Sequence, residues 1–244
     1  MAYSGPLTTT RTRVYPIASI CSRISAGACL FFSLFVLNCY MPTVHHGSRH
    51  PLVIVLSGPS GVGKDATIAR IKETGVKFHY VVTATTREKR PGETDGVDYH
   101  FLGRRKFEKK IELGDFIEYA EVYGNLYGVP KDEVSQAMQR GQDVIIKVDV
   151  QGATTLKTKI PDAVFIFLLT PSLEDLLARL KARNADSEVA MSTRMCKAED
   201  ELKCLPLFDY CVVNHTNDLD RTAEAVAAII KTEKHRVNPR VVSI

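Results

Sequence analysis

The feature that most constrains the fold is an apolar segment followed at once by a glycine-rich loop and a helix pattern. Residues 52–57 (Leu-Val-Ile-Val-Leu-Ser) form a continuous run rich in β-branched residues, which is typical of a strand buried on both faces of a parallel sheet. The loop Gly58-Pro59-Ser60-Gly61-Val62-Gly63-Lys64-Asp65 follows, and residues 64–74 then show helical spacing before Gly75. This order predicts a phosphate site, because loop N–H groups and the positive end of the helix face one point.

The loop fits G-x-x-x-x-G-K-[ST] at every position except the last, so all eight of its residues are predicted to bind ATP. Lys64 would reach the outer phosphates. Asp65 stands where a hydroxyl usually ligates the magnesium that accompanies ATP. A carboxylate is also a hard oxygen ligand, and our hypothesis is that Asp65 holds Mg²⁺ directly or through water. The alternative is that Asp65 only helps to cap the helix.

The rest of the chain continues the alternation of strands and helices. Residues 144–148, 164–169 and 210–213 have the same buried-strand composition, and each is followed by a helical pattern. This predicts an α/β domain with a parallel sheet. Between about 83 and 130 the periodicity weakens, which indicates an irregular insertion of the kind that carries binding residues. A polar gap at about 184–193 is interpreted as a mobile lid.

Polar and basic residues gather at the start of that insertion. Residues 83–93 read TATTREKRPGE, and residues 96–101 read GVDYHF. Arg87 and Arg90, followed by a Pro-Gly turn and Tyr99, could converge on a dianion through charge-assisted hydrogen bonds. Alone, such a loop is more often simply solvated.

Together with the phosphate loop, these strings resemble those of guanylate kinases, which move the γ-phosphate of ATP to GMP. Further matching strings lie at residues 114–119 (GDFIEY), 123–128 (YGNLYG) and 149–152 (DVQG), and the resemblance covers essentially all of 51–244. It implies a three-layer P-loop kinase fold with a parallel sheet core. It also implies a GMP-binding insert at about 83–130 and a lid at about 184–193 that close around both nucleotides.

The resemblance also implies roles for individual residues on the GMP side. The phosphate ligands match Arg87, Arg90, Tyr99 and Tyr127, the guanine readers match Thr83 and Glu118, and Asp149 would contact guanine or the water shell of the metal. Glu93 and Gln151 belong to the same matching strings and are also predicted to bind GMP. Chemistry supports Glu118 independently, because guanine offers N1–H and N2–H donors to one carboxylate, whereas adenine presents an acceptor there.

On the ATP side the resemblance implies three catalytic cations: Lys64, Arg183 and Arg194. Arg179 lies one helical turn before Arg183 on the same face. Phosphoryl transfer depends mostly on positioning and cationic stabilisation, which lid arginines could supply. The alternative for each arginine is an ordinary surface ion pair. Asn214 matches an adenine-side contact.

Two positions depart from the family pattern in ways that alter local charge or hydrogen bonding. Lys147 stands where the family commonly has the first acid of a D-x-D pattern, and Val129 replaces a common hydroxyl. With an acid gained at position 65 and one lost at 147, the local charge is redistributed. We expect these changes to affect affinity more than the class of reaction.

The sequence thus predicts a magnesium-dependent enzyme that phosphorylates GMP, and also dGMP, with ATP. The main alternative is a catalytically inactive guanylate-kinase-like binding module, and another is a kinase of a different nucleoside monophosphate. The complete glycine loop, Lys64 and the lid arginines argue against the binding module, and Glu118 argues against a kinase of another nucleoside monophosphate. A monomer is favoured, although no sequence feature decides the oligomeric state.

The first 50 residues differ in composition from the rest. They contain four Arg and no acidic residue, which leaves 28 basic and 28 acidic residues in 51–244. A neutral body argues against a nucleic-acid partner, and no membrane association is expected for the mature domain. An acid-poor, Ser- and Arg-bearing segment predicts an organelle transit peptide and linker, handled by the import machinery, with a plastid favoured over a mitochondrion. The apolar residues 26–37 leave a secretory signal, or an unprocessed extension, as alternatives.

Overall fold

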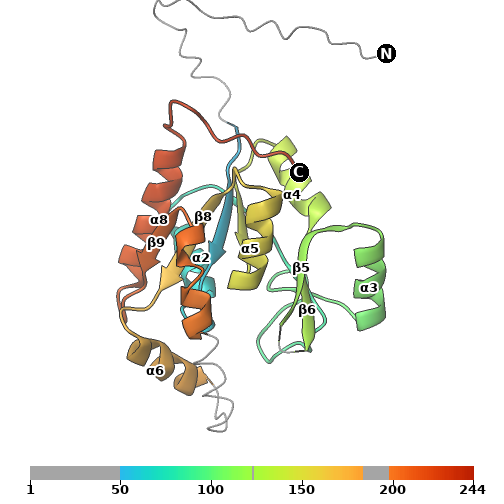
Figure 1. Cartoon of the computed structure of the whole chain (residues 1–244), viewed down its shortest axis with the longest axis horizontal. Helices are drawn as coiled ribbons and strands as arrows, with labels where there is room; N and C mark the ends of the chain where they lie inside the picture. Colours follow the sequence, from blue (N-terminus) through green and yellow to red (C-terminus); the bar gives the residue numbers. More distant parts are fainter. Residues whose placement is uncertain (1–49, 123, 184–197) are drawn as a thin grey trace, which may run out of the picture. The chain divides into compact units, whose positions relative to one another are not determined.

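The computed structural model describes residues 50–122, 124–183 and 198–244, so the predicted leader and the predicted lid lie outside the described residues. Its largest element is a five-stranded parallel sheet in the order β2-β7-β1-β8-β9, of which β8 and β9 are labelled in Figure 1. The strands are β2 (His79–Tyr80), β7 (Val144–Lys147), β1 (Val53–Ser57), β8 (Val164–Leu169) and β9 (Tyr210–Val213). The predicted α/β class with a parallel sheet is therefore confirmed.

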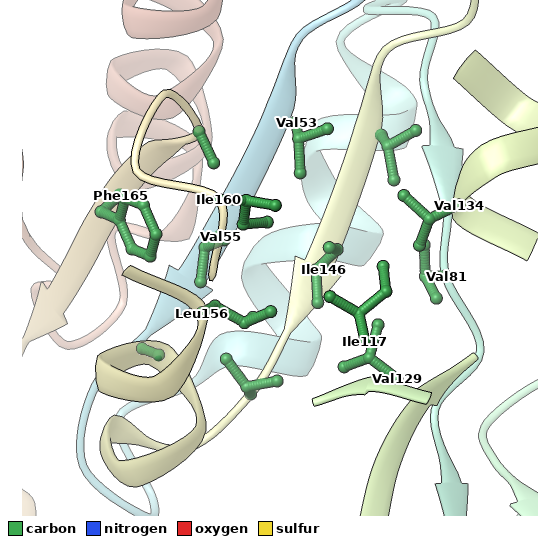
Figure 2. Packing of buried hydrophobic residues seen from close by; sticks show 14 of the residues in the cluster. Val53, Val55, Val81, Ile117, Val129, Val134, Ile146, Leu156, Ile160 and Phe165 are labelled. Carbon is green, nitrogen blue, oxygen red and sulfur yellow. The ribbon is translucent and has the colours of Figure 1, made fainter. Parts of the chain in front are cut away.

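Helices cover both faces of this sheet because successive strand side chains point in opposite directions. Val53 and Val55 of β1 pack with α4 (Lys131–Gln139) and α5 (Val150–Lys159) in one core (Figure 2). Ile54 and Leu56 pack with α2 (Lys64–Glu73) and α8 (Leu219–Glu233) in the other. The three-layer prediction is confirmed, and both cores fix β1, from which the phosphate loop emerges.

The insertion is more regular than expected, so the prediction of an irregular segment at 83–130 is wrong. It contains a second sheet in the order β4-β3-β6-β5, with α3 (Arg104–Glu112) packed against it. The strands are β4 (His100–Phe101), β3 (Ala84–Thr85), β6 (Asn125–Pro130) and β5 (Phe116–Val122). Two of these strands are only two residues long, which is too short to show a period of two.

Gly128 of β6 shows why a glycine stands inside this second sheet. A Cβ atom at Gly128 would lie 2.9 Å from ring atoms of both Phe107 and Phe116. Those two rings stack with centroids 4.6 Å apart and form the small core beneath α3. The glycine therefore permits the aromatic packing that holds the insertion together.

The chain after β8 continues into α6 (Leu173–Arg183), whose start agrees with the predicted serine cap. The backbone N–H of Asp175 donates to Ser172 Oγ at 3.1 Å. Residues 198–202 are helical, and η2 (Leu205–Leu207) leads into β9. Among the described helices, none is both long enough and apolar enough to span a bilayer.

Candidate functional site

The candidate site lies at the carboxyl edge of the parallel sheet. The glycine loop leaves β1 there, Lys147 ends β7, and Asp149 follows it. Asn214 follows β9 at the same edge. Ligands of open α/β sheets bind at the carboxyl ends of the strands, so the topology gathers the predicted residues where a ligand is expected.

The phosphate loop has a backbone that only glycines adopt easily. Gly58, Gly61 and Gly63 have φ values of 141°, 84° and 99°. A Cβ atom at Gly58 would also lie 2.3 Å from the carbonyl oxygen of Leu168. The loop is thus held against β8 and leads directly into the N-terminus of α2, as the motif predicts.

Lys64 folds back over the loop. Its Nζ donates to the carbonyl oxygens of Gly58 at 2.6 Å and Pro59 at 3.1 Å. Burial lowers the pKa of Lys64 to about 8, and the carboxylates of Glu201 and Asp65 act in the opposite direction. An anionic phosphate beside Lys64 would favour its charged form, so nucleotide binding and protonation of Lys64 support each other.

Two polar side chains hold the loop through the carbonyl oxygen of Val62. Asn214 is buried and donates from Nδ2 to the carbonyl oxygen of Val62 at 2.8 Å, while its Oδ1 accepts from Thr222 at 3.1 Å. Arg179 donates to the carbonyl oxygens of Val62 at 3.2 Å and Asn214 at 2.8 Å. The amide of Asn214 is therefore committed to the loop, and its predicted contact with adenine stays a prediction.

The predicted phosphate ligands of the acceptor lie together in the insertion. The guanidinium of Arg87 donates to both carboxylate oxygens of Glu93, at 2.7 and 3.1 Å, and stands 5.3 Å from the centre of the Tyr99 ring. Tyr99 meets Tyr127 edge to face, with ring centroids 6.1 Å apart. Arg90 is exposed, and its backbone N–H donates to Glu93 at 2.8 Å. Glu93 thus links Arg87 to the backbone at Arg90, and its predicted contact with GMP stays a prediction.

The predicted guanine reader is an unusual carboxylate. Glu118 of β5 is only 2% exposed, and within the described part of the chain its Oε1 has no hydrogen-bond partner. Burial, with the charge of nearby Asp149, raises the pKa of Glu118 to about 8. Asp149 Oδ1 caps α5 by accepting from Gly152 N at 2.8 Å, and Asp149 Oδ2 likewise has no partner among the described residues.

Close packing around Glu118 explains why its carboxylate is shielded from solvent. A Cβ atom at Gly152 would lie 3.0 Å from Glu118 Oε1. Thr83, the other predicted guanine contact, is also buried at this edge. A buried carboxylate oxygen without a donor costs free energy, and a ligand that brings N–H donors would recover it.

The two departures from the family pattern contact each other. Lys147 Nζ donates to Asp65 Oδ1 at 2.5 Å. Lys147 is 7% exposed and Asp65 is 61% exposed at the side chain, so a buried ammonium meets a carboxylate that is open to solvent. Burial disfavours the charged form of Lys147, but Tyr99 and Asp65 outweigh it and raise the pKa of Lys147.

Several predicted site residues are placed less informatively. Ser60 and Gln151 are exposed, and Val62 is buried within the loop. Arg183 is the last residue of α6, whereas Arg194 lies outside the described residues. The sequence reasoning did not identify the Lys147–Asp65 contact or the role of Thr222 behind Asn214. The acid gained at position 65 and the acid lost at position 147 could have indicated the contact between them. No sequence pattern indicates the role of Thr222.

Comparisons with known proteins agree on one family. A family model described as guanylate kinase matches residues 50–233. A guanylate kinase from Lactococcus lactis is 46% identical over 187 residues, which cover 77% of this chain and 90% of that protein. Guanylate kinase 2, chloroplastic/mitochondrial, from Oryza sativa subsp. japonica is 44% identical over 195 residues, covering 80% of this chain and 68% of that protein. The crystal structure of guanylate kinase from Anaplasma phagocytophilum gives a TM-score of 0.64 at 29% identity, covering 78% and 89% of the two chains.

Proposed function

This chain belongs to the guanylate kinase family and transfers a phosphate group from ATP to GMP, and we propose that the phosphate loop holds ATP while the insertion holds GMP. The glycine loop, its following helix α2 and the folded-back Lys64 support the first assignment. The cluster of Arg87, Tyr99 and Tyr127 supports the second. Lys147, at the end of β7, contacts both Asp65 after the loop lysine and the Tyr99 ring of the cluster, and this proximity suits direct transfer between two bound nucleotides.

The observation that carries the assignment of GMP is the buried Glu118 carboxylate. One of its oxygens lacks a donor within the described residues, and its pKa is raised to about 8. Guanine would supply two donors, N1–H and the N2 amine, to this buried carboxylate. Adenine would place a ring-nitrogen lone pair against the same carboxylate, which disfavours AMP.

The reaction needs positive charge more than proton transfer. The phosphate of GMP already carries negative oxygens, so no general base is required for attack on the γ-phosphate. Lys64 would stabilise the transferring group on the loop side, and Arg183 and Arg194 would add charge from the lid side. Arg87 and Arg90 would hold the acceptor phosphate, and closure around both nucleotides would exclude water.

Magnesium is proposed as the metal that accompanies ATP. The described residues contain no cluster of three or more His, Cys, Asp or Glu side chains that could hold a metal ion alone. Magnesium bound to nucleotides uses phosphate oxygens and waters with one or two carboxylates, so the exposed Asp65 carboxylate beside Lys64 fits this mode. When bound, the ion would neutralise charge on the β- and γ-phosphates.

An organellar location is also proposed. The acid-free, Arg-bearing composition of residues 1–50 supports import, and a similar rice protein is named chloroplastic/mitochondrial. A plastid is favoured over a mitochondrion because hydroxyl residues are abundant in the segment. Fusing residues 1–50 to a fluorescent protein and imaging plant cells tests this, since fluorescence throughout the cytosol would contradict organellar import.

The direct test of the proposed function is an assay of ADP release by the full chain with ATP and magnesium. GMP, dGMP, AMP, CMP and UMP are compared as acceptors. We expect turnover with GMP and dGMP, and turnover with AMP lower by about 10³-fold or more, because a buried, unsatisfied carboxylate is a strong basis for rejection. A folded protein that binds GMP but phosphorylates none of the acceptors would support the inactive binding module instead.

A further inference from the structure

Lys147 lies where the loop and the acceptor cluster approach each other. It ends β7 and pairs in register with Leu56 of β1, next to the start of the phosphate loop. Its Nζ bonds Asp65, the residue after the loop lysine. On the other side, Lys147 Nζ stands 4.6 Å from the centre of the Tyr99 ring.

The Tyr99 ring has a second cation beside it. Arg87 Cζ is 5.3 Å from the centre of this ring, and Tyr127 meets the ring at its edge. Arg87 and Lys147 thus approach one aromatic side chain from two separate elements, the insertion and the parallel sheet. A dianionic phosphate beside Tyr99 would lie between these two cations and could accept charge-assisted hydrogen bonds from both.

Burial gives a further reason to assign a ligand to Lys147. A buried ammonium is costly unless its three donors are used, and the pair with Asp65 accounts for one of them. The Tyr80 hydroxyl is a second hydrogen-bond partner of this ammonium, and the Tyr99 ring stabilises its charge without accepting a full hydrogen bond. The third donor can therefore bond a phosphate oxygen without breaking the contact with Asp65.

We propose that Lys147 is a further ligand of the acceptor phosphate and that Asp65 positions its ammonium. This proposal rests on the proposed function, because it needs a nucleoside monophosphate in the acceptor site. The positive charge of Lys147 would reduce the repulsion between the GMP phosphate and the ATP phosphates that are proposed to bind at the loop. Asp65 would act through Lys147, in addition to any contact it makes with the water shell of magnesium.

The first experiment measures binding of GMP and of guanosine to the full chain, without ATP and without magnesium. Lys147→Met should weaken GMP binding by about 10- to 100-fold, the range of one hydrogen bond between charged groups, and leave guanosine binding unchanged. Asp65, which loses the ion pair in this variant, is 61% exposed at the side chain, so water can solvate its carboxylate and the fold should be retained. Lys147→Arg should recover part of the affinity for GMP.

Lys157→Met is a matched control for this substitution. Lys157 also pairs with an aspartate, Asp209 at 3.2 Å, and stands 4.3 Å from the centre of the Phe165 ring, but it lies away from the sheet edge. This variant should bind GMP as the unmodified chain does. Equal losses for GMP and guanosine in Lys147→Met, or unchanged GMP binding, would overturn the proposed phosphate contact.

A second experiment separates positioning by Asp65 from a role in metal binding alone. Asp65→Asn should weaken magnesium-free GMP binding by several-fold, and Asp65→Asn combined with Lys147→Met should bind GMP no worse than Lys147→Met. Unchanged GMP affinity in Asp65→Asn would refute the positioning role. If the unmodified chain itself neither binds nor phosphorylates GMP, the proposed function fails, and that result is distinct from any effect of the variants.

Discussion

The phosphate loop and the acceptor site meet at one sheet edge, but different parts of the chain hold them in place. The loop is a backbone structure, with three glycines at positive φ and carbonyl groups fixed by Lys64, Asn214 and Arg179. The acceptor site consists of side chains that project from short strands and turns. Its charged groups are held by one another, as in the pair of Arg87 with Glu93.

This difference indicates how each site handles its ligand. The loop is preformed, so binding a triphosphate needs little beyond new partners for its N–H groups and for Lys64. The acceptor site has a buried carboxylate with one oxygen that lacks a donor among the described residues, and charged groups that position one another, so binding depends on whether the base satisfies that carboxylate. We therefore expect the loop to govern turnover and the acceptor site to govern selectivity, and the following predictions test that division.

The largest effect is expected for Lys64→Met in the phosphate loop. Without the cation, charge on the transferring phosphate is poorly stabilised, and kcat should fall by about 10³-fold while GMP binding changes little. Steady-state assays and calorimetry would measure the two quantities. Lys77→Met, an exposed lysine beyond α2, is the control and should leave both unchanged. A loss of GMP affinity as large as the loss of kcat would contradict the division between the sites.

Glu118→Gln should show the opposite profile. A glutamine offers one acceptor and places its own N–H₂ group against a guanine donor, so kcat/KM for GMP should fall by about 10²- to 10³-fold, with AMP much less affected. Glu121→Gln on the same strand is a matched control, because Glu121 is half-exposed and forms an ion pair of 3.6 Å with the equally exposed Arg104. Equal losses for GMP and AMP would show that Glu118 is structural and does not read the base.

The two regions also differ in how far their structure follows from sequence. The strand, glycine loop and helix at 52–74 have a period, a spacing and conformational demands that local chemistry enforces, so their bounds were predicted to within one or two residues. The insertion was predicted to be irregular. Its strands at Ala84–Thr85 and His100–Phe101 are too short to carry a pattern, and they form because they pair with each other and because the first also pairs with β6.

For the site, the sequence predicted which residues belong to it better than it predicted which of them contact each other. The resemblance to guanylate kinases placed Arg87, Tyr99 and Glu118 in the acceptor site, and the structure brings Arg87 and Tyr99 together. The pairing of Lys147 with Asp65 joins residues 82 positions apart, and only the strand register brings them into contact. The burial of Glu118 likewise depends on Gly152, which belongs to α5. Contacts of this kind arise from packing, which a single sequence does not encode locally.

The raised pKa of Glu118 predicts a dependence of GMP binding on pH. In the free protein the carboxyl group loses its proton near pH 8, and binding requires the ionised form. Affinity should therefore fall by about fivefold between pH 8 and pH 7, with proton release at pH 7. Calorimetry in two buffers of different ionisation enthalpy measures both effects. Glu118→Gln provides the reference for titration of the ligand itself, and an equal pH dependence in that variant would refute the assignment.

The same group should influence stability without ligand. The folded protein keeps the Glu118 proton up to about pH 8, whereas the unfolded chain loses it near the ordinary value of 4.5. The stability it contributes is thus present below pH 4.5 and lost as the pH rises through about 8. Chemical denaturation of Glu118→Gln should show a smaller decrease of the unfolding free energy across this window than the unmodified chain shows.

The smallest effect is expected for Glu93→Gln in the acceptor cluster. Glu93 holds the Arg87 guanidinium and the backbone N–H of Arg90, and these contacts outweigh its partial burial and lower the pKa of its carboxyl group. The amide retains one acceptor, so Arg87 should be held less firmly and KM for GMP should rise about threefold with kcat unchanged. Glu88→Gln in the same loop is the control. A lower KM would contradict this prediction. It would mean that Glu93 competes with the phosphate for Arg87 and does not position it.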